Sequence, residues 1–200
     1  MGLVNGITRK AVDEMTESVL NFGRVAARGA LAGLVALAAP AGLTAQTQLG
    51  IELGAEPAPL ALDLIAGPGE AAGRIDLGDS FGERPVVLQF WATWCPLCEA
   101  LEPKMVAAHE EFGDRVDFYA VAVAVGQNPK RIARHLEDHP LPFPMLWDEN
   151  GEATRRFQAP TTSYVVILDA DGRVAYTGVD SDQDIRGALT SIVGTAPTGG

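Results

Sequence analysis

Two cysteines, three positions apart, constrain this 200-residue chain more than any other feature. They are the only cysteines it has, and they stand in the stretch Trp94-Cys95-Pro96-Leu97-Cys98, shortly after the apolar run Val86 to Trp91. Such a run is typical of a strand that is buried on both faces of a sheet. We expect the chain to turn sharply after it and to enter a helix spanning about residues 95–112.

The number and spacing of the cysteines favour a redox-active pair over a disulfide that only stabilises the fold. A secreted scaffold held by disulfides normally carries more cysteines at wide spacings. Closing so short a loop also removes little entropy from the unfolded chain. Zinc usually needs four ligands, and His109 lies too far along the same helix to join the two thiols. An inert pair of core thiols remains as an alternative.

A helix N-terminus suits Cys95 for nucleophilic chemistry. Unpaired backbone N–H groups and the positive end of the helix dipole favour a thiolate there. Cys98 follows one helical turn later, within disulfide reach but less exposed, as a resolving thiol should be. Pro96 removes an N–H where it is least missed, and Trp94 offers an apolar platform beside the sulfur. The pattern predicts dithiol–disulfide exchange with Cys95 and Cys98 as catalytic residues, and with no metal or cofactor.

The charge of the chain argues against nucleic acid as a partner. The formal net charge is −11, and no basic stretch is present that could follow a phosphate backbone. Hydrophobic residues make up 47% of the chain, enough for one sizeable core.

The N-terminal residues 1–45 read as an extension followed by an export segment. Arg24 and Arg28 precede the uncharged run Ala30 to Ala39, and a small residue, Ala45, ends a plausible cleavage site. The run is short for a membrane span, so a cleaved signal peptide and a retained anchor through residues 24–45 both stay open. An Ala/Gly-rich surface helix is a further alternative, against which the glycine content and the missing polar face argue. The segment is expected to direct the protein to the periplasm or to the extracytoplasmic face of a membrane.

The remaining chain divides into a linker at 46–58, one domain at 59–194 and a flexible tail at 195–200. In the domain, strands are expected at 60–65 and 74–77, joined by a turn at Gly67-Pro68-Gly69, then at 86–91, 116–125, 145–147, 164–168 and 174–178. Helices are expected at 95–112, from Asn128-Pro129 to about 139, and at 180–193. This order predicts an α/β fold with a mixed sheet and helices on both faces.

With Trp91-Ala92-Thr93-Trp94-Cys95-Pro96-Leu97-Cys98 on a strand-to-helix turn, the chain resembles the thioredoxins. More narrowly, it resembles the TlpA/ResA-like membrane-tethered or periplasmic members. Pro103 falls where the active-site helix of the family carries its kinking proline, and residues 127–146 match the extra helix-and-strand insert. Ala159-Pro160-Thr161-Thr162, followed by 165–172, matches the cis-proline loop and hairpin of the family.

The resemblance covers roughly residues 55–193. It implies a thioredoxin fold with an N-terminal β-hairpin extension and a central αβ insert. It also implies a cis bond between Ala159 and Pro160 that faces Cys95 and presents backbone groups to a substrate chain. Substrate-binding residues are then Trp94 and Pro96 beside the cysteines, and Ala159, Pro160 and Thr161 in the loop.

Two positions depart from the family pattern. Gln89 stands where thioredoxin has a buried aspartate, and Leu101 stands where the TlpA/ResA group often has a glutamate. Neither usual proton shuttle for Cys98 is therefore present. Glu99 and Glu102 are nearby but are expected on a solvated face of the helix.

By resemblance, the reaction is the reduction of disulfides in exported proteins, of the cytochrome c or copper-site maturation type, with a membrane thiol reductant as electron donor. A Cu(I)-binding metallochaperone-like module is one alternative, because soft thiolates suit Cu(I). A thiol peroxidase is another, although Thr93 precedes Cys95 by two positions instead of the three of the peroxidase loop.

Other chemistry-bearing residues have structural interpretations. His135 and His139 have a spacing that suits a metal on one helix face, but they lack a third ligand and fit a helix C-terminus. An acidic cluster at 180–184 is expected at a helix N-terminus instead of a calcium site. Four aromatic residues are expected in the core: Trp91, Phe143, Trp147 and Phe157.

Overall fold

A computed structural model describes residues 49–65 and 73–194. The predicted leader at 24–45, the turn at Gly67-Pro68-Gly69 and the tail at 195–200 lie outside the described residues. Within the two described ranges, no helix combines the length and the apolar character needed to cross a membrane.

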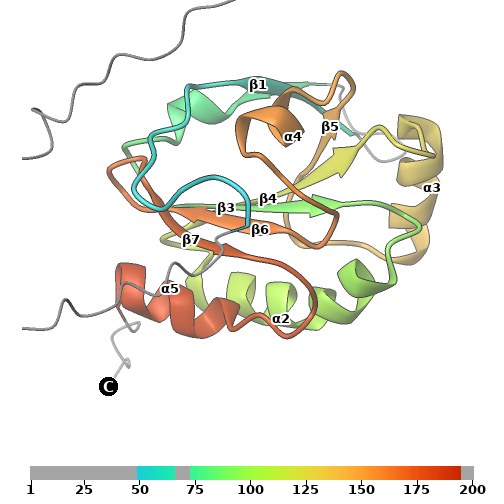
Figure 1. The fold of residues 1–200 in the computed structure, drawn as a ribbon. Helices are drawn as coiled ribbons and strands as arrows, with labels where there is room; N and C mark the ends of the chain where they lie inside the picture. The colour runs from blue at the N-terminus through green and yellow to red at the C-terminus, as the bar shows by residue number, and fades with distance from the viewer. Residues whose placement is uncertain (1–48, 66–72, 195–200) are drawn as a thin grey trace, which may run out of the picture. The chain divides into compact units, whose positions relative to one another are not determined.

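The strands form one mixed sheet with the order β2-β1-β5-β4-β3-β6-β7 (Figure 1). Strand β3 lies inside this sheet, parallel to β4 and antiparallel to β6. Strand β4 is also parallel to β5, and the remaining neighbours are antiparallel. The strands are β1 Ala61–Leu64, β2 Arg74–Asp76, β3 Val86–Trp91, β4 Asp117–Val123, β5 Met145–Asp148, β6 Val165–Leu168 and β7 Val174–Gly178.

Helices cover both faces of the sheet. Helices α2 (Pro96–Phe112), α3 (Pro129–Asp138) and α5 (Ile185–Val193) contribute buried residues to one hydrophobic core. Helix α4 (Glu152–Arg156) and the 3₁₀ turn η1 (Leu77–Asp79) contribute to a second core on the opposite face. Figure 1 shows α2 and α5 below the sheet and α4 above it. The predicted thioredoxin fold, with its hairpin β1–β2 and its insert α3–β5, is confirmed.

Local sequence explains where the helices begin. Asn128 is the N-cap of α3, where its side chain accepts a hydrogen bond from the Arg131 N–H at 3.0 Å, and Pro129 takes the first helical position as predicted. The last helix begins later than expected, at Ile185, because Asp184 is its N-cap and Asp180 has a left-handed φ of 69°. Of the predicted core aromatics, Trp91, Phe143 and Phe157 are buried and Trp147 is half-buried.

The interpretation of residues 46–58 as a linker is wrong for the described part, 49–58. The Ile51 side chain is 5% exposed and belongs to the second core. Its N–H lies 3.1 Å from the Phe157 carbonyl oxygen and 3.2 Å from the Tyr164 hydroxyl oxygen. Further along, Gly54 and Ala55 exchange backbone hydrogen bonds with Val174. The segment therefore packs on the domain, through contacts between residues far apart in the sequence.

The close approach of Gly50 to Tyr164 gives a test of this packing. Gly50 has a φ of +88°, and a Cβ there would lie 2.1 Å from the Tyr164 hydroxyl oxygen. We expect Gly50→Ala to lower the free energy of unfolding by about 3 kcal/mol, from left-handed strain plus overpacking. Gly54→Ala is the matched control, since Gly54 has a φ of +79° but open space around it. It should cost only about 1–2 kcal/mol in urea unfolding, and equal losses would contradict the packing.

Candidate active site

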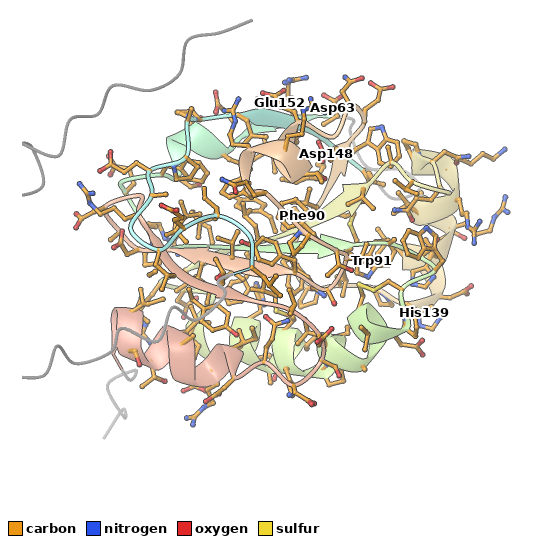
Figure 2. All side chains as sticks on the ribbon, in the orientation of Figure 1. Asp63, Phe90, Trp91, His139, Asp148 and Glu152 are labelled. Atoms are coloured by element: carbon orange, nitrogen blue, oxygen red, sulfur yellow. A yellow bond between two sulfur atoms is a disulfide. The ribbon has the colours of Figure 1, made fainter. Side chains whose placement is uncertain are left out.

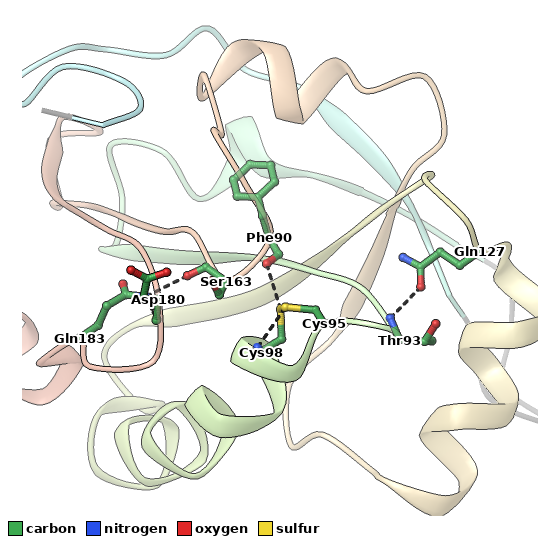
Figure 3. Close-up of a disulfide and its surroundings, with 8 residues drawn as sticks. All are labelled: Phe90, Thr93, Cys95, Cys98, Gln127, Ser163, Asp180 and Gln183. Carbon is green, nitrogen blue, oxygen red and sulfur yellow. Dashed lines mark hydrogen bonds between the residues drawn. A yellow bond between two sulfur atoms is a disulfide. The ribbon is translucent and has the colours of Figure 1, made fainter.

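The turn from β3 into α2 places Cys95 at a helix N-terminus. Cys95 is the N-cap of α2, with an extended backbone, and Pro96 takes the first helical position. The Cys98 N–H donates a hydrogen bond to Cys95 Sγ over 3.0 Å (Figure 3). This is the interaction predicted from the helix terminus, and a backbone donor aimed at the sulfur favours the thiolate once the disulfide opens. Cys95 and Cys98 form a disulfide, with their Cα atoms 5.2 Å apart.

The two sulfur atoms have different surroundings. Cys95 is 7% exposed, whereas Cys98 is fully buried. Cys98 Sγ lies 3.9 Å from the Phe90 carbonyl oxygen. In the reduced protein, this oxygen can accept a hydrogen bond from a Cys98 thiol and would repel a thiolate. The arrangement therefore favours Cys95 as the attacking thiolate and Cys98 as the protonated resolving thiol.

A glutamine that the sequence did not single out holds the active-site loop. Gln127 Oε1 accepts a hydrogen bond from the Thr93 N–H at 2.9 Å, and its Nε2 donates to the Val123 carbonyl oxygen at 2.7 Å. Beside it, Trp94 Nε1 donates to the Val125 carbonyl oxygen at 2.7 Å. These contacts form because parallel strands β3 and β4 end at the same edge of the sheet. Their only sequence signal is a polar side chain just after a buried strand.

The predicted cis-proline loop differs from expectation. No peptide bond among the described residues is cis, so the bond between Ala159 and Pro160 is trans. The loop instead turns through left-handed Gln158 and Ser163, with φ values of 49° and 64°. It still ends beside the active site, because the Ser163 N–H donates to the Phe90 carbonyl oxygen at 2.8 Å. Ala159 is half-buried, and Pro160 and Thr161 are exposed.

Cys95 opens into a cavity of about 550 Å³ between α2 and α3. Its wall includes Glu99 and Glu102 from α2 and His135 and His139 from α3. The two imidazole rings are stacked with centroids 4.7 Å apart, and the His135 ring packs 5.3 Å from that of Trp91. Figure 2 shows Trp91 and His139 at the end of the domain where α2 begins. The glutamates therefore line a cavity as well as the solvated face expected for them.

Burial of the His135 ring lowers its pKa, and the neighbouring His139 lowers it further. Glu102, Asp138 and Glu99 act in the opposite direction but do not outweigh burial. The His135 imidazole is therefore mainly neutral near pH 7. Among the residues that the structure describes, no group of three His, Cys, Asp or Glu side chains is placed to hold a metal ion.

The two positions that depart from the thioredoxin pattern lie under the active site. Gln89 is 2% exposed, and its Nε2 has no hydrogen-bond partner within the described ranges. Leu101 is fully buried in the same core as Cys98. No carboxylate occupies either position.

A thioredoxin fold that presents a Cys-x-x-Cys disulfide at the N-terminus of its first core helix defines the class of thioredoxin-like thiol–disulfide oxidoreductases. Within that class, the chain belongs to the AhpC/TSA family, whose model matches residues 60–177.

The chain is also similar to individual proteins. The chain is 30% identical over 127 residues to the thioredoxin-like protein YneN of Bacillus subtilis, covering 62% of this chain and 70% of that protein. It is 27% identical over 116 residues to the thiol-disulfide oxidoreductase ResA of Oceanobacillus iheyensis, covering 58% of this chain and 56% of that protein. A secreted disulfide oxidoreductase of Mycobacterium tuberculosis shares the fold, with a TM-score of 0.56 at 21% identity over 66% of this chain and 95% of that one.

The role of Gln127 in holding the loop is testable. Gln127→Met leaves the Thr93 N–H and the Val123 carbonyl without these partners, and we expect it to lower the free energy of unfolding by about 1–3 kcal/mol. Hydrogen exchange at the Thr93 amide should accelerate in the same variant. Gln127→Glu keeps an acceptor for Thr93, so it should preserve the slow exchange there. Unchanged exchange at Thr93 in Gln127→Met would show that the glutamine does not hold the loop.

Proposed function

We propose that this protein reduces disulfide bonds in exported proteins. The Cys95 thiolate attacks one sulfur of a substrate disulfide and forms a mixed disulfide, and the other substrate sulfur leaves as a thiol. Cys98 then attacks Cys95 Sγ, so that the substrate is released with both sulfurs reduced and the Cys95–Cys98 disulfide forms. A membrane thiol reductant would return two electrons to the pair.

The observation that carries the proposal is the unequal environment of the two sulfurs. A backbone N–H points at the partly accessible Cys95 sulfur, and a carbonyl oxygen lies beside the buried Cys98 sulfur. A disulfide that served only to stabilise the fold would not need one sulfur suited to be a nucleophile and the other suited to be a resolving thiol.

The proposed location and substrates of the protein are supported by its N-terminal segment and by the names of its relatives. The basic stretch and apolar run at 24–39 support export to the periplasm or to the outer face of a membrane, where disulfides form. Several relatives carry the name thiol-disulfide oxidoreductase ResA, which supports thiol–disulfide exchange as the reaction. We further propose that the substrates belong to the maturation of cytochrome c or copper sites, where cysteines must be free before they receive heme or metal.

The different roles of Cys95 and Cys98 predict different results for two serine variants. Cys95→Ser should abolish the catalysis of insulin reduction, because no nucleophile remains. Cys98→Ser should instead accumulate a mixed disulfide on Cys95, since the resolving thiol is missing. Non-reducing mass spectrometry measures the adduct. An adduct that formed on Cys98 in the Cys95→Ser variant at the same rate would reverse the assigned roles.

The direction of electron flow is tested by the reduction potential of the pair. Equilibration of the protein against glutathione or dithiothreitol, followed by quantification of the two redox forms, gives this value. We expect a potential near that of thioredoxin, about −270 mV, for a reductase. A value near about −120 mV would mean an oxidase and would overturn the proposed direction.

A further inference from the structure

The surface beside Cys95 carries an unusual share of the exposed apolar side chains. Five large hydrophobic residues in the described ranges are clearly exposed. Three of them belong to the active-site turn or to the loop hydrogen-bonded to it. Trp94 is 45% exposed, Leu97 41% and Val125 67%. We call these three residues the apolar rim. Exposed apolar side chains gathered at one place on a surface mark an interaction site.

The cavity between α2 and α3 lies next to Cys95 and forms a second part of the proposed substrate-binding surface. Cys95 lines the same cavity as Glu99 and Glu102, so a chain bonded to Cys95 would place its neighbouring side chains close to these carboxylates. Trp91, Trp94 and Thr93 also belong to the cavity wall. The wall therefore offers carboxylates and apolar side chains to an occupant.

The cavity wall contains more acidic than permanently cationic side chains. Neither Glu99 nor Glu102 takes part in an ion pair within 49–65 and 73–194. No lysine or arginine belongs to the cavity wall. His135 supplies little compensating charge near pH 7, because burial lowers its pKa.

We infer that this cavity is a subsite for a lysine or arginine side chain that flanks the reactive cysteine of the substrate. Carboxylates attract the cationic head of either side chain. The long aliphatic stem of either residue suits a cavity with both polar and apolar walls. A neighbouring apolar residue of the substrate packs on the apolar rim. This inference rests on the proposed function and narrows its substrate class to cysteines in a basic and apolar sequence context.

The subsite can be tested with peptide disulfides that differ only in the residue flanking the cysteine. The reduced protein is mixed with peptides whose cysteine is flanked by lysine, glutamine or glutamate, and the rate of oxidation is followed by tryptophan fluorescence. The second-order rate constant for the lysine peptide should exceed that for the glutamate peptide by about tenfold at low salt. The difference should shrink as salt is added.

Matched variants show whether Glu99 and Glu102 cause the preference for the lysine peptide. The double variant Glu99→Gln and Glu102→Gln should bring the ratio of lysine to glutamine rates close to one. This ratio cancels any change in the reactivity of Cys95 itself. The control is Glu110→Gln, which removes the same charge from an exposed position of α2 outside the cavity wall and should keep the ratio. An equal loss of preference in Glu110→Gln would indicate general electrostatic attraction and would overturn the subsite.

The subsite and the proposed function fail in different ways. If all three peptides are reduced at equal rates, the subsite is wrong and the oxidoreductase function stands. If the reduced protein reacts with none of them, the proposed function fails and the subsite fails with it.

Discussion

Burial of strand β3 along its whole length is the constraint on which the arrangement of the site depends. All six residues from Val86 to Trp91 are buried, and β3 is hydrogen-bonded to β4 on one side and β6 on the other. Alternate side chains enter the two cores, so the strand cannot slip by one residue without exposing both sets. The position of its last residue, and hence of Cys95, is fixed by the sheet.

From that fixed point, the helix terminus supplies the chemistry. At the start of α2, the Cys98 N–H lies 3.0 Å from Cys95 Sγ and 3.1 Å from the Cys95 carbonyl oxygen, so the sulfur shares this donor with the backbone. The Phe90 carbonyl oxygen lies near Cys98 Sγ and also accepts the Ser163 N–H. The same backbone atom thus links the buried cysteine to the loop that follows α4. Within the described residues, the buried side chains at the two positions singled out from the sequence, Gln89 and Leu101, carry no charge.

Much of this could be read from the sequence, because local patterns determined it. The apolar run of β3, the Cys-x-x-Cys at a helix start and the cap at Asn128 each depend on neighbours within a few residues. Contacts across long separations were not visible. The packing of Ile51 on Tyr164 spans 113 positions, and the bond from Thr93 to Gln127 spans 34. The cavity depends on how α3 lies against α2, and the left-handed backbone of Gln158 and Ser163 in the Pro160 loop has no signal in the sequence.

The bond between Gln127 and Thr93 also bears on how such a chain can change over evolutionary time. It joins the loop before Cys95 to the insert, so the two loops share one set of steric and polar requirements. A deletion in the 124–128 loop that removed or displaced Gln127 would leave the Thr93 N–H without this acceptor, even though neither cysteine had been altered. We therefore expect substitutions in the loop before Cys95 and in the 124–128 loop to be accepted mainly when both loops change together.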